Sequence, residues 1–429
     1  MRELINLQVG QCGNQIGSMF WEKVCQEHNI DPVGECKGLT SVQDSRLRIY
    51  FTKCSDTRYV PRAIFVDLEN GTHDVIRKGP YGQLFKPEYY ISAASGAGNN
   101  FAKGFYTEGA ELVDRIFDSV RKEVEQCESL QGFQVVHSSG GGTGSGLGSR
   151  IISSLHDDYS DKIISSFTVF PSPKVSDVVV EPYNATLCLN HLVESTSATF
   201  CQDNEALYNI CSNSLKIAQP NYQDLNRMVS DAMSGITACV RFPGQLNSDF
   251  RKLVVNLTPY PRLHFYLNSI APLTSVASQQ YRSLSVADVT NEMFESKNMM
   301  VACDTNAGKY FAVAALFRGK LSTKEVEDHM VSLHKKHEKI FVNWIPNNVL
   351  TASTDVPLST APVSGTFIGN STAIMSMYQR IVETCSKMYE KKAFLHWYTE
   401  EGMEPADITE SISSIQDLIA EYKSKDESA

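Results

Sequence analysis

Short runs of apolar residues alternate with longer amphipathic stretches through the first half of the chain. The apolar runs, which have the length and β-branched content of buried strands, occupy residues 4–9, 63–68, 133–137 and 163–169. The amphipathic stretches, in which apolar residues recur at helical spacing, occupy residues 16–27, 107–128 and 147–155. Strands that alternate with helices predict βαβ units, so we expect a Rossmann-like parallel sheet with helices on both faces.

The pattern changes after residue 203. Two helices are expected over 203–217 and 222–239, and shorter strand-like and helical segments then follow in a less regular order. Beyond residue 371, two apolar stripes with i, i+4, i+7 spacing predict a helical hairpin. We therefore predict an α/β fold of three parts: a parallel-sheet domain over 1–203, a core helix with a mixed α/β domain over 204–371, and a C-terminal helical domain over 372–429.

A glycine-rich run, Gly140-Gly141-Gly142-Thr143-Gly144-Ser145-Gly146, stands between a predicted strand and a predicted helix. Glycine lets the backbone approach a ligand closely, and a helix start offers free N–H groups and the positive end of the helix dipole, which suit phosphate. No Lys-Ser or Lys-Thr follows, so this is not a Walker A loop, and the spacing does not fit G-x-G-x-x-G. We favour a phosphate-binding turn of a third kind over a flexible surface loop.

Polar loops follow the other predicted strands of the first domain. They occupy residues 10–15, 67–71 and 171–181, and a further glycine-rich loop occupies residues 94–100. In doubly wound sheets ligands bind outside the carboxyl ends of the strands, so these loops are expected to surround one site. The carboxylates of the second loop are placed to hold Mg²⁺ through water, and Asp177 and Glu181 are placed to hold ribose hydroxyls. Each loop alone is weak support for a ligand-binding site, but the occurrence of all of them in one domain is much stronger support.

Three residues beyond the first domain could recognise a base. Tyr222 offers an aromatic plane for stacking, and Asn204 and Asn226 offer amides that both donate and accept at a purine edge. For any one of these asparagines, capping a helix is the alternative. The sequence permits guanine without proving it.

Composition excludes several other classes of function. The net charge of −10 argues against a nucleic-acid-binding protein, which needs a basic surface. The 11 cysteines are odd in number and never form C-x-x-C, so neither a zinc site nor a disulfide framework is indicated. No leader-like start and no run of 18 apolar residues is present, so we expect a cytoplasmic protein without membrane insertion.

The glycine-rich run GGGTGSG resembles the signature of the tubulin family, and seven further motifs support the resemblance over essentially the whole chain. They are GQCGNQ at 10–15, FAKG at 101–104, YTEGAE at 106–111, VEPYNA at 180–185, FPGQLN at 242–247, WIPNN at 344–348 and AFLHWY at 393–398. Within the family the chain resembles the β type, because Lys252 stands where α-tubulin carries a glutamate. The short stretch between Thr351 and Thr366 also lacks the insertion typical of α chains.

The resemblance implies a subunit with GTP or GDP and Mg²⁺ as cofactors, which pairs with α-tubulin. The heterodimers join other tubulin dimers in protofilaments of cytoplasmic microtubules, where associated proteins and motors bind. The α subunit that adjoins on assembly supplies the acid that orients the attacking water, so no catalytic residue is assigned to this chain. One alternative is a structural polymer subunit that keeps its GTP unhydrolysed. Another, a nicotinamide-dependent dehydrogenase, is disfavoured by the missing G-x-G-x-x-G.

The resemblance also assigns roles to individual positions. The nucleotide contacts that it implies are Gln11, Cys12, Gln15, Asn99, Ser138, Gly140, Gly141, Gly142, Thr143, Gly144, Asp177, Glu181, Asn204, Tyr222 and Asn226. Glu69 matches the acid associated with Mg²⁺, and Cys239 matches a position that lines the family's colchicine pocket. The residues expected at subunit interfaces are Lys252, Val276 and Ala277.

Three departures from the family pattern change these expectations. Asn70 replaces a proline after Glu69, which removes a constraint on φ in the segment that senses the γ-phosphate. Val276 and Ala277 replace an Arg-Gly pair in a loop of lateral contacts, which should alter those contacts. The glutamate-rich tail typical of β-tubulins does not follow Tyr422: either this is a tail-poor type, or the sequence omits a disordered end. The expectation of motors and associated proteins is weaker for that reason.

Overall fold

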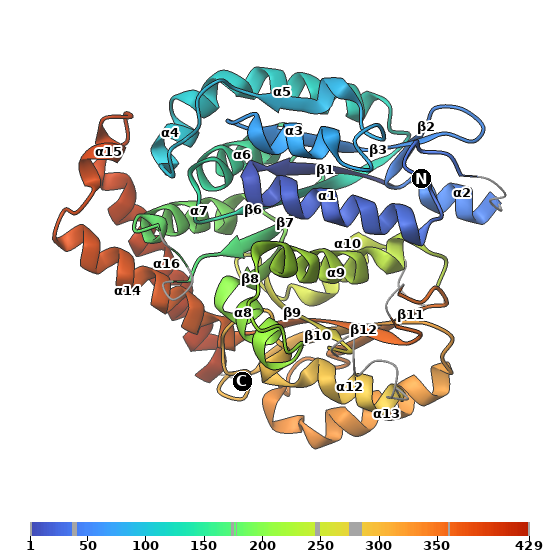
Figure 1. Cartoon of the computed structure of the whole chain (residues 1–429). Helices are drawn as coiled ribbons and strands as arrows, with labels where there is room; N and C mark the ends of the chain where they lie inside the picture. The colour runs from blue at the N-terminus through green and yellow to red at the C-terminus, as the bar shows by residue number, and fades with distance from the viewer. Residues whose placement is uncertain are drawn as a thin grey trace. The chain divides into compact units, whose positions relative to one another are not determined.

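The computed structural model (Figure 1) describes residues 2–36, 41–172, 176, 178–244, 249–273, 285–358 and 361–427. The chain divides into two compact units. The first unit comprises Met1–Thr199 and Tyr378–Ile419, and the second comprises Phe200–Met377 and Ala420–Ala429. The predicted three-part division at residues 203 and 371 stays a prediction.

The first unit is built on a five-stranded parallel sheet. The strands, in their order across the sheet, are β7 (Ile163–Phe170), β6 (Leu130–Ser138), β1 (Glu3–Val9), β4 (Ala63–Asp67) and β5 (Tyr90–Ser92). In the central strand β1, Leu7 lies opposite Ile64 on one side and Val135 on the other. Every residue of β1, β4 and β7 is buried, as expected for parallel strands covered on both faces. The predicted Rossmann-like parallel sheet is confirmed.

The first 199 residues also form helices and a small hairpin. They are α1 (Gly10–Glu27), α2 (Ser41–Leu47), α3 (Gly71–Lys78), α4 (Phe101–Phe105), α5 (Glu108–Glu125), α6 (Gly148–Asp158), α7 (Glu181–Ser195) and the antiparallel pair β2 (Phe51–Lys53) and β3 (Tyr59–Pro61). Helix α1 contacts β1, β4, β6 and α3, while α6 contacts α5, α7, β6 and β7. In α5 the buried Leu112, Ile116 and Val120 lie four residues apart, so the helix packs with one face as the sequence predicts.

The second unit contains a mixed sheet, which confirms the predicted mixed α/β architecture. Its strands, in order, are β11 (Val349–Thr354), β10 (Tyr310–Arg318), β12 (Ser364–Ser371) and β9 (Phe265–Ala271). Strand β10 runs parallel to β11 and antiparallel to β12, and β12 runs antiparallel to β9. Its core includes Val289, Met293, Val313, Phe317 and Phe367.

The remaining elements of the middle of the chain are mostly helical. They are β8 (Ala198–Asp203), which contains the boundary between the units, and α8 (Asn204–Asn213), α9 (Tyr222–Arg241), α10 (Phe250–Leu257), α12 (Val286–Phe294) and α13 (Thr323–Lys336). Helix α12 packs on β9, β12 and α13. The observed α9 agrees closely with the helix expected over 222–239.

The chain ends in three helices, α14 (Met375–Glu390), α15 (Leu395–Thr399) and α16 (Pro405–Glu427). Tyr389 joins the two long helices, because its hydroxyl donates to the Pro405 carbonyl at 3.1 Å and accepts from the Thr409 hydroxyl at 3.1 Å. Ile408 and Ile415 are fully buried on the predicted apolar stripe. The predicted C-terminal helical hairpin is therefore confirmed.

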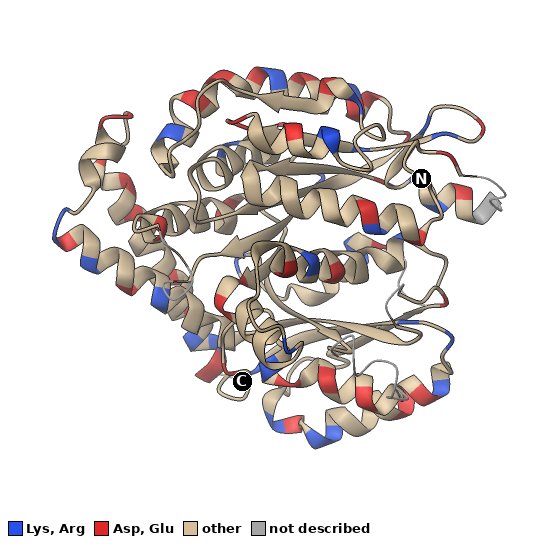
Figure 2. Ribbon diagram, viewed as in Figure 1, with Lys and Arg blue, Asp and Glu red and all other residues tan. Residues whose placement is uncertain are grey.

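Acidic and basic side chains are interspersed along the helices (Figure 2). On α5, for example, Arg115 and Arg121 lie among Glu111, Asp114 and Asp118. Among the residues that the structure describes, no helix is both long and apolar enough to cross a membrane.

Candidate functional site

The segments that follow the strands of the first unit converge at the carboxyl edge of its sheet. Four glycines show how closely they approach, because a Cβ atom added to each would meet a neighbouring segment. The distances from such a Cβ are 3.0 Å from Gly10 to the Gly144 nitrogen, 2.1 Å from Gly96 to Glu69 Oε1, 3.2 Å from Gly140 to Glu181 Oε1, and 2.6 Å from Gly142 to the Asn100 nitrogen. The expected ring of strand-end segments is therefore present, and glycine permits its close contacts.

The glycine-rich run is more helical than the sequence suggests. After β6, the Ser139 N–H donates to the Val169 carbonyl at 2.9 Å, and a short turn leads into one wide π-helical turn, Thr143–Leu147, which continues as α6. The helix expected over 147–155 is therefore present as α6 (Gly148–Asp158), and the π-helical turn precedes it directly. Gly146 explains the tight packing of this turn, because a Cβ there would lie 2.3 Å from the Phe101 carbonyl oxygen.

Residues 10–15 are also helical, which corrects the expectation of a turn before a helix at residue 16. Helix α1 begins at Gly10, whose φ of +74° lets the chain change direction directly after β1. Gln11 and Cys12 thus lie on the first turn of α1, where a helix presents unpaired backbone N–H groups, and Gln15 lies one turn further along. Burial raises the pKa of the Cys12 thiol to about 12, so this group stays protonated at neutral pH.

The buried side chain of His137 contacts the glycine-rich run, a role that the sequence did not reveal. Its ring is fully buried, with Nδ1 2.9 Å from the Gly144 carbonyl and Nε2 3.0 Å and 3.1 Å from the hydroxyls of Ser166 and Thr168. Burial lowers the His137 pKa to about 4, so the neutral ring donates from Nδ1 to Gly144. A polar residue at the end of a buried apolar strand was the signal that could have indicated it.

Two carboxylates follow β4. Asp67 is buried, and its Oδ1 accepts from the Leu68 N–H at 2.8 Å, whereas Glu69 is exposed and lies against Gly96. The structure shows no group of three or more metal-ligating side chains within its described residues. One or two carboxylates that leave further positions to phosphate oxygens and water suit Mg²⁺, so the donors present fit that ion beside a phosphate chain.

Asp67 makes a pH-dependent contribution to stability. Burial raises its pKa from 3.8 to about 6, so the folded protein retains this proton where the unfolded chain has lost it. Stability therefore falls as pH rises through this interval. In metal-free and nucleotide-free protein, Asp67→Asn is expected to increase the free energy of unfolding by about 3 kcal/mol at pH 8 and by about 1 kcal/mol less at pH 5.

Asparagine keeps the acceptor for the Leu68 N–H but cannot ionise. Denaturant unfolding of both proteins at the two pH values measures the difference. An equal gain at pH 5 and pH 8 would show that ionisation of Asp67 is not the cause.

Several other predicted contacts lie along the same edge of the sheet. Ser138 ends β6, and Asn99 is exposed in the loop before α4 with a φ of +57°. Glu181 is the first residue of α7, and burial raises the pKa of its carboxyl group. Asp177 lies outside the described residues.

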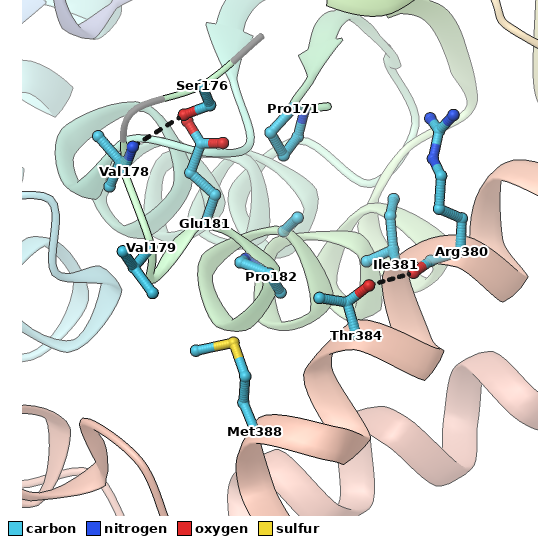
Figure 3. A pocket seen from close by; sticks show the side chains of 11 residues that line it. Pro171, Ser176, Val178, Val179, Glu181, Pro182, Arg380, Ile381, Thr384 and Met388 are labelled. Carbon is cyan, nitrogen blue, oxygen red and sulfur yellow. Dashed lines mark hydrogen bonds between the residues drawn. The ribbon is translucent and has the colours of Figure 1, made fainter. Parts of the chain in front are cut away.

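Glu181 also lines a cavity of about 300 Å³ in the first unit (Figure 3). The wall is largely apolar, with Pro171 and Val179 on one side and Ile381 and Met388 of α14 on the other. The cavity therefore lies beside Glu181, which was predicted to hold a ribose hydroxyl.

The predicted base contacts belong to the second unit. Asn204 and Tyr222 are the first residues of α8 and α9, and Asn226 lies one turn further along α9, where it is buried. Capping does not account for either asparagine, because Asp203 caps α8 and Asn221 caps α9 in a capping box with Asp224. Tyr222 has 63% of its surface exposed, so its ring is accessible within this unit.

Cys239 and Lys252 also belong to the second unit. Cys239 is buried in α9, where burial raises its pKa to about 12. Lys252 is exposed on α10. Val276 and Ala277 lie outside the described residues.

A parallel sheet whose glycine-rich strand ends gather at its carboxyl edge defines a nucleotide-binding α/β protein. Residues 3–212 match the Tubulin/FtsZ family, GTPase domain, and residues 261–383 match the tubulin C-terminal domain. Together these matches span well over half of the chain, so the chain belongs to the tubulin family. It is a tubulin-like GTP-binding polymer subunit with a GTPase domain.

Proposed function

We propose that this chain is a β-type tubulin. It pairs with an α-type tubulin, the heterodimers polymerise into cytoplasmic microtubules, and the GTP of this chain is hydrolysed after assembly. The observation that carries the proposal is the convergence of segments 10–15, 67–71, 94–100 and 140–146 at one edge of the sheet. Lys252 supports the β type, because it replaces the glutamate of α chains.

The nucleotide-binding residues of this proposal differ in the part of the nucleotide that each one holds. The backbone N–H groups of the glycine-rich run and of the start of α1 bind the phosphates, and Glu69 holds Mg²⁺ directly or through water. Asp177 and Glu181 hold the ribose, while Asn204, Tyr222 and Asn226 recognise the base. The remaining proposed contacts are Gln11, Cys12, Gln15, Asn99, Ser138, Gly140, Gly141, Gly142, Thr143 and Gly144. Bound Mg²⁺ would neutralise phosphate charge.

Hydrolysis is divided between subunits in this proposal. The adjoining α subunit supplies the acid that orients the attacking water, so hydrolysis waits for assembly. Lys252 is exposed on α10 and is not acidic, so this chain does not orient an attacking water at the nucleotide of its partner. Val276 and Ala277 alter the lateral contacts between protofilaments, and Cys239 belongs to a drug-binding pocket.

The nucleotide content of the polymer tests this division. Polymer assembled with α-tubulin from GTP-loaded protein is expected to contain GDP in this chain, whereas unassembled heterodimer retains GTP. Chromatography of nucleotides released from both samples measures the ratio. GTP retained in the polymer by this chain would instead support the alternative, a structural subunit with unhydrolysed nucleotide.

A further inference from the structure

We propose that Asn184 is a positioning residue that holds two nucleotide loops together and links them to α15. The inference rests on the proposed function, because it takes segments 94–100 and 140–146 as nucleotide-binding. Asn184 is the fourth residue of α7, and its side chain is fully buried.

The amide of Asn184 uses its full hydrogen-bonding capacity. Its Nδ2 donates to the carbonyls of Asn99 and Gly140, at 2.7 Å each. Its Oδ1 accepts from the Phe101 N–H at 3.0 Å and from the Tyr398 hydroxyl at 2.7 Å. An asparagine amide has two donors and two acceptor lone pairs, so all four are occupied. No other uncharged side chain of this size offers the same set.

These bonds fix the direction of backbone groups on both loops. In a trans peptide the carbonyl and the following N–H point in opposite directions. Because the Gly140 carbonyl is held on Asn184, the Gly141 N–H is directed away from Asn184. The same side chain holds Asn99, before α4, and Phe101, at the start of α4. Asn184 therefore sets the separation and orientation of the two loops at once.

Tyr398 connects this arrangement to the C-terminal helices. It lies on α15, is 1% exposed, and has a pKa that burial raises, so its hydroxyl remains a donor to Asn184. A second bond ties the same region together, from Asn100 Nδ2 to the Trp397 carbonyl at 2.8 Å. A displacement of α15 would thus reach both loops through Asn184, 214 positions away in sequence from Tyr398.

The neighbouring Tyr183 provides a matched control. It is also fully buried, and its hydroxyl donates to the Ala393 carbonyl at 3.0 Å, so it joins α7 to the same C-terminal region without bonding to the Asn184 amide. The two tyrosine rings pack edge to face with centroids 5.5 Å apart. Tyr398→Phe and Tyr183→Phe each remove one buried hydroxyl, but only the first removes a bond to Asn184.

The test measures dissociation of labelled GTP and the thermal unfolding midpoint, using the full chain in heterodimer with α-tubulin. Asn184→Asp places an oxygen against the carbonyls of Asn99 and Gly140 and is expected to accelerate GTP dissociation by about tenfold or more. Tyr398→Phe is expected to accelerate it by about threefold, and Tyr183→Phe to leave it unchanged at a similar loss of thermal stability.

Equal effects of the two tyrosine variants on GTP dissociation would overturn the inference, as would an unchanged rate in Asn184→Asp. If Asn184→Asp does not fold, the comparison of GTP dissociation between Tyr398→Phe and Tyr183→Phe tests the inference by itself. Gly142→Ala separates this failure from that of the proposed function: if it weakens GTP binding while Asn184→Asp does not, only the role of Asn184 is wrong. If neither variant changes GTP binding, the proposed nucleotide site itself is wrong.

Discussion

Replacing Gly142 by alanine is expected to weaken GTP binding by about 100-fold or more, which is about 3 kcal/mol. The added Cβ would lie 2.6 Å from the Asn100 nitrogen and 2.8 Å from the Ala97 Cβ, distances that real Cβ contacts do not show. Relief requires that the loop before α4 move away from the glycine-rich run, because backbone atoms cannot rotate aside. Titration with a fluorescent GTP analogue measures the change. Overpacking should also lower stability by about 1–3 kcal/mol.

Gly141→Ala is the control at the adjacent position. A Cβ there would meet only the Ser138 hydroxyl, at the ordinary contact distance of 3.6 Å. Its unfolding midpoint is therefore expected to equal that of the wild type, so any loss of GTP affinity in this variant reports contact with the nucleotide itself. Wild-type affinity and stability in Gly142→Ala would refute the role of this close approach.

Lys252→Glu is expected to cause hydrolysis of the nucleotide held by the partner α subunit in the assembled polymer. In the proposed division of hydrolysis, the α subunit carries an acid at this position, and an acid there orients water at the neighbouring nucleotide. Lys252 is exposed on α10, whose buried face is formed by Phe250, Leu253 and Leu257, so the substitution should not disturb the fold. Nucleotides released from the polymer should then be GDP from both subunits.

Lys252→Gln is the matched variant, because it removes the positive charge without adding a carboxylate. We expect this variant to leave the GTP of the α subunit intact. Hydrolysis in both variants would show that the loss of positive charge is responsible, and hydrolysis in neither would argue that the acid at this position does not act in trans.

The elements of this fold that local patterns can specify were predictable. The strands at 133–137 and 163–169 and the helix at 222–239 follow from apolar runs and helical periodicity, and β6, β7 and α9 lie there. Strand β11 escaped prediction because it is only partly buried and carries no strong alternation. The meeting of the polar strand-end segments at one edge of the sheet also followed from sequence, since parallel strands place their carboxyl ends together.

Details that depend on neighbouring elements were not predictable in the same way. Gly10 and Gly142 both read as turn glycines, yet the first begins α1 and the second leads into a π-helical turn. Asn204 and Asn226 read as possible helix caps, but Asp203 and Asn221 hold those positions in the structure. Several residues near a helix start are chemically able to cap it, and the path of the preceding chain decides which one does.

The sequence by itself determined the parallel sheet, because hydrophobic periodicity acts over a few residues. It also determined the family and the position of the glycine-rich run, because both are carried by short motifs. Only the tertiary structure decided which backbones meet. It placed Gly142 against Asn100, His137 beneath Gly144, and Asn184 between two loops and Tyr398. Such contacts join residues far apart in the chain, so their geometry is set by the packing of whole elements rather than by any local pattern.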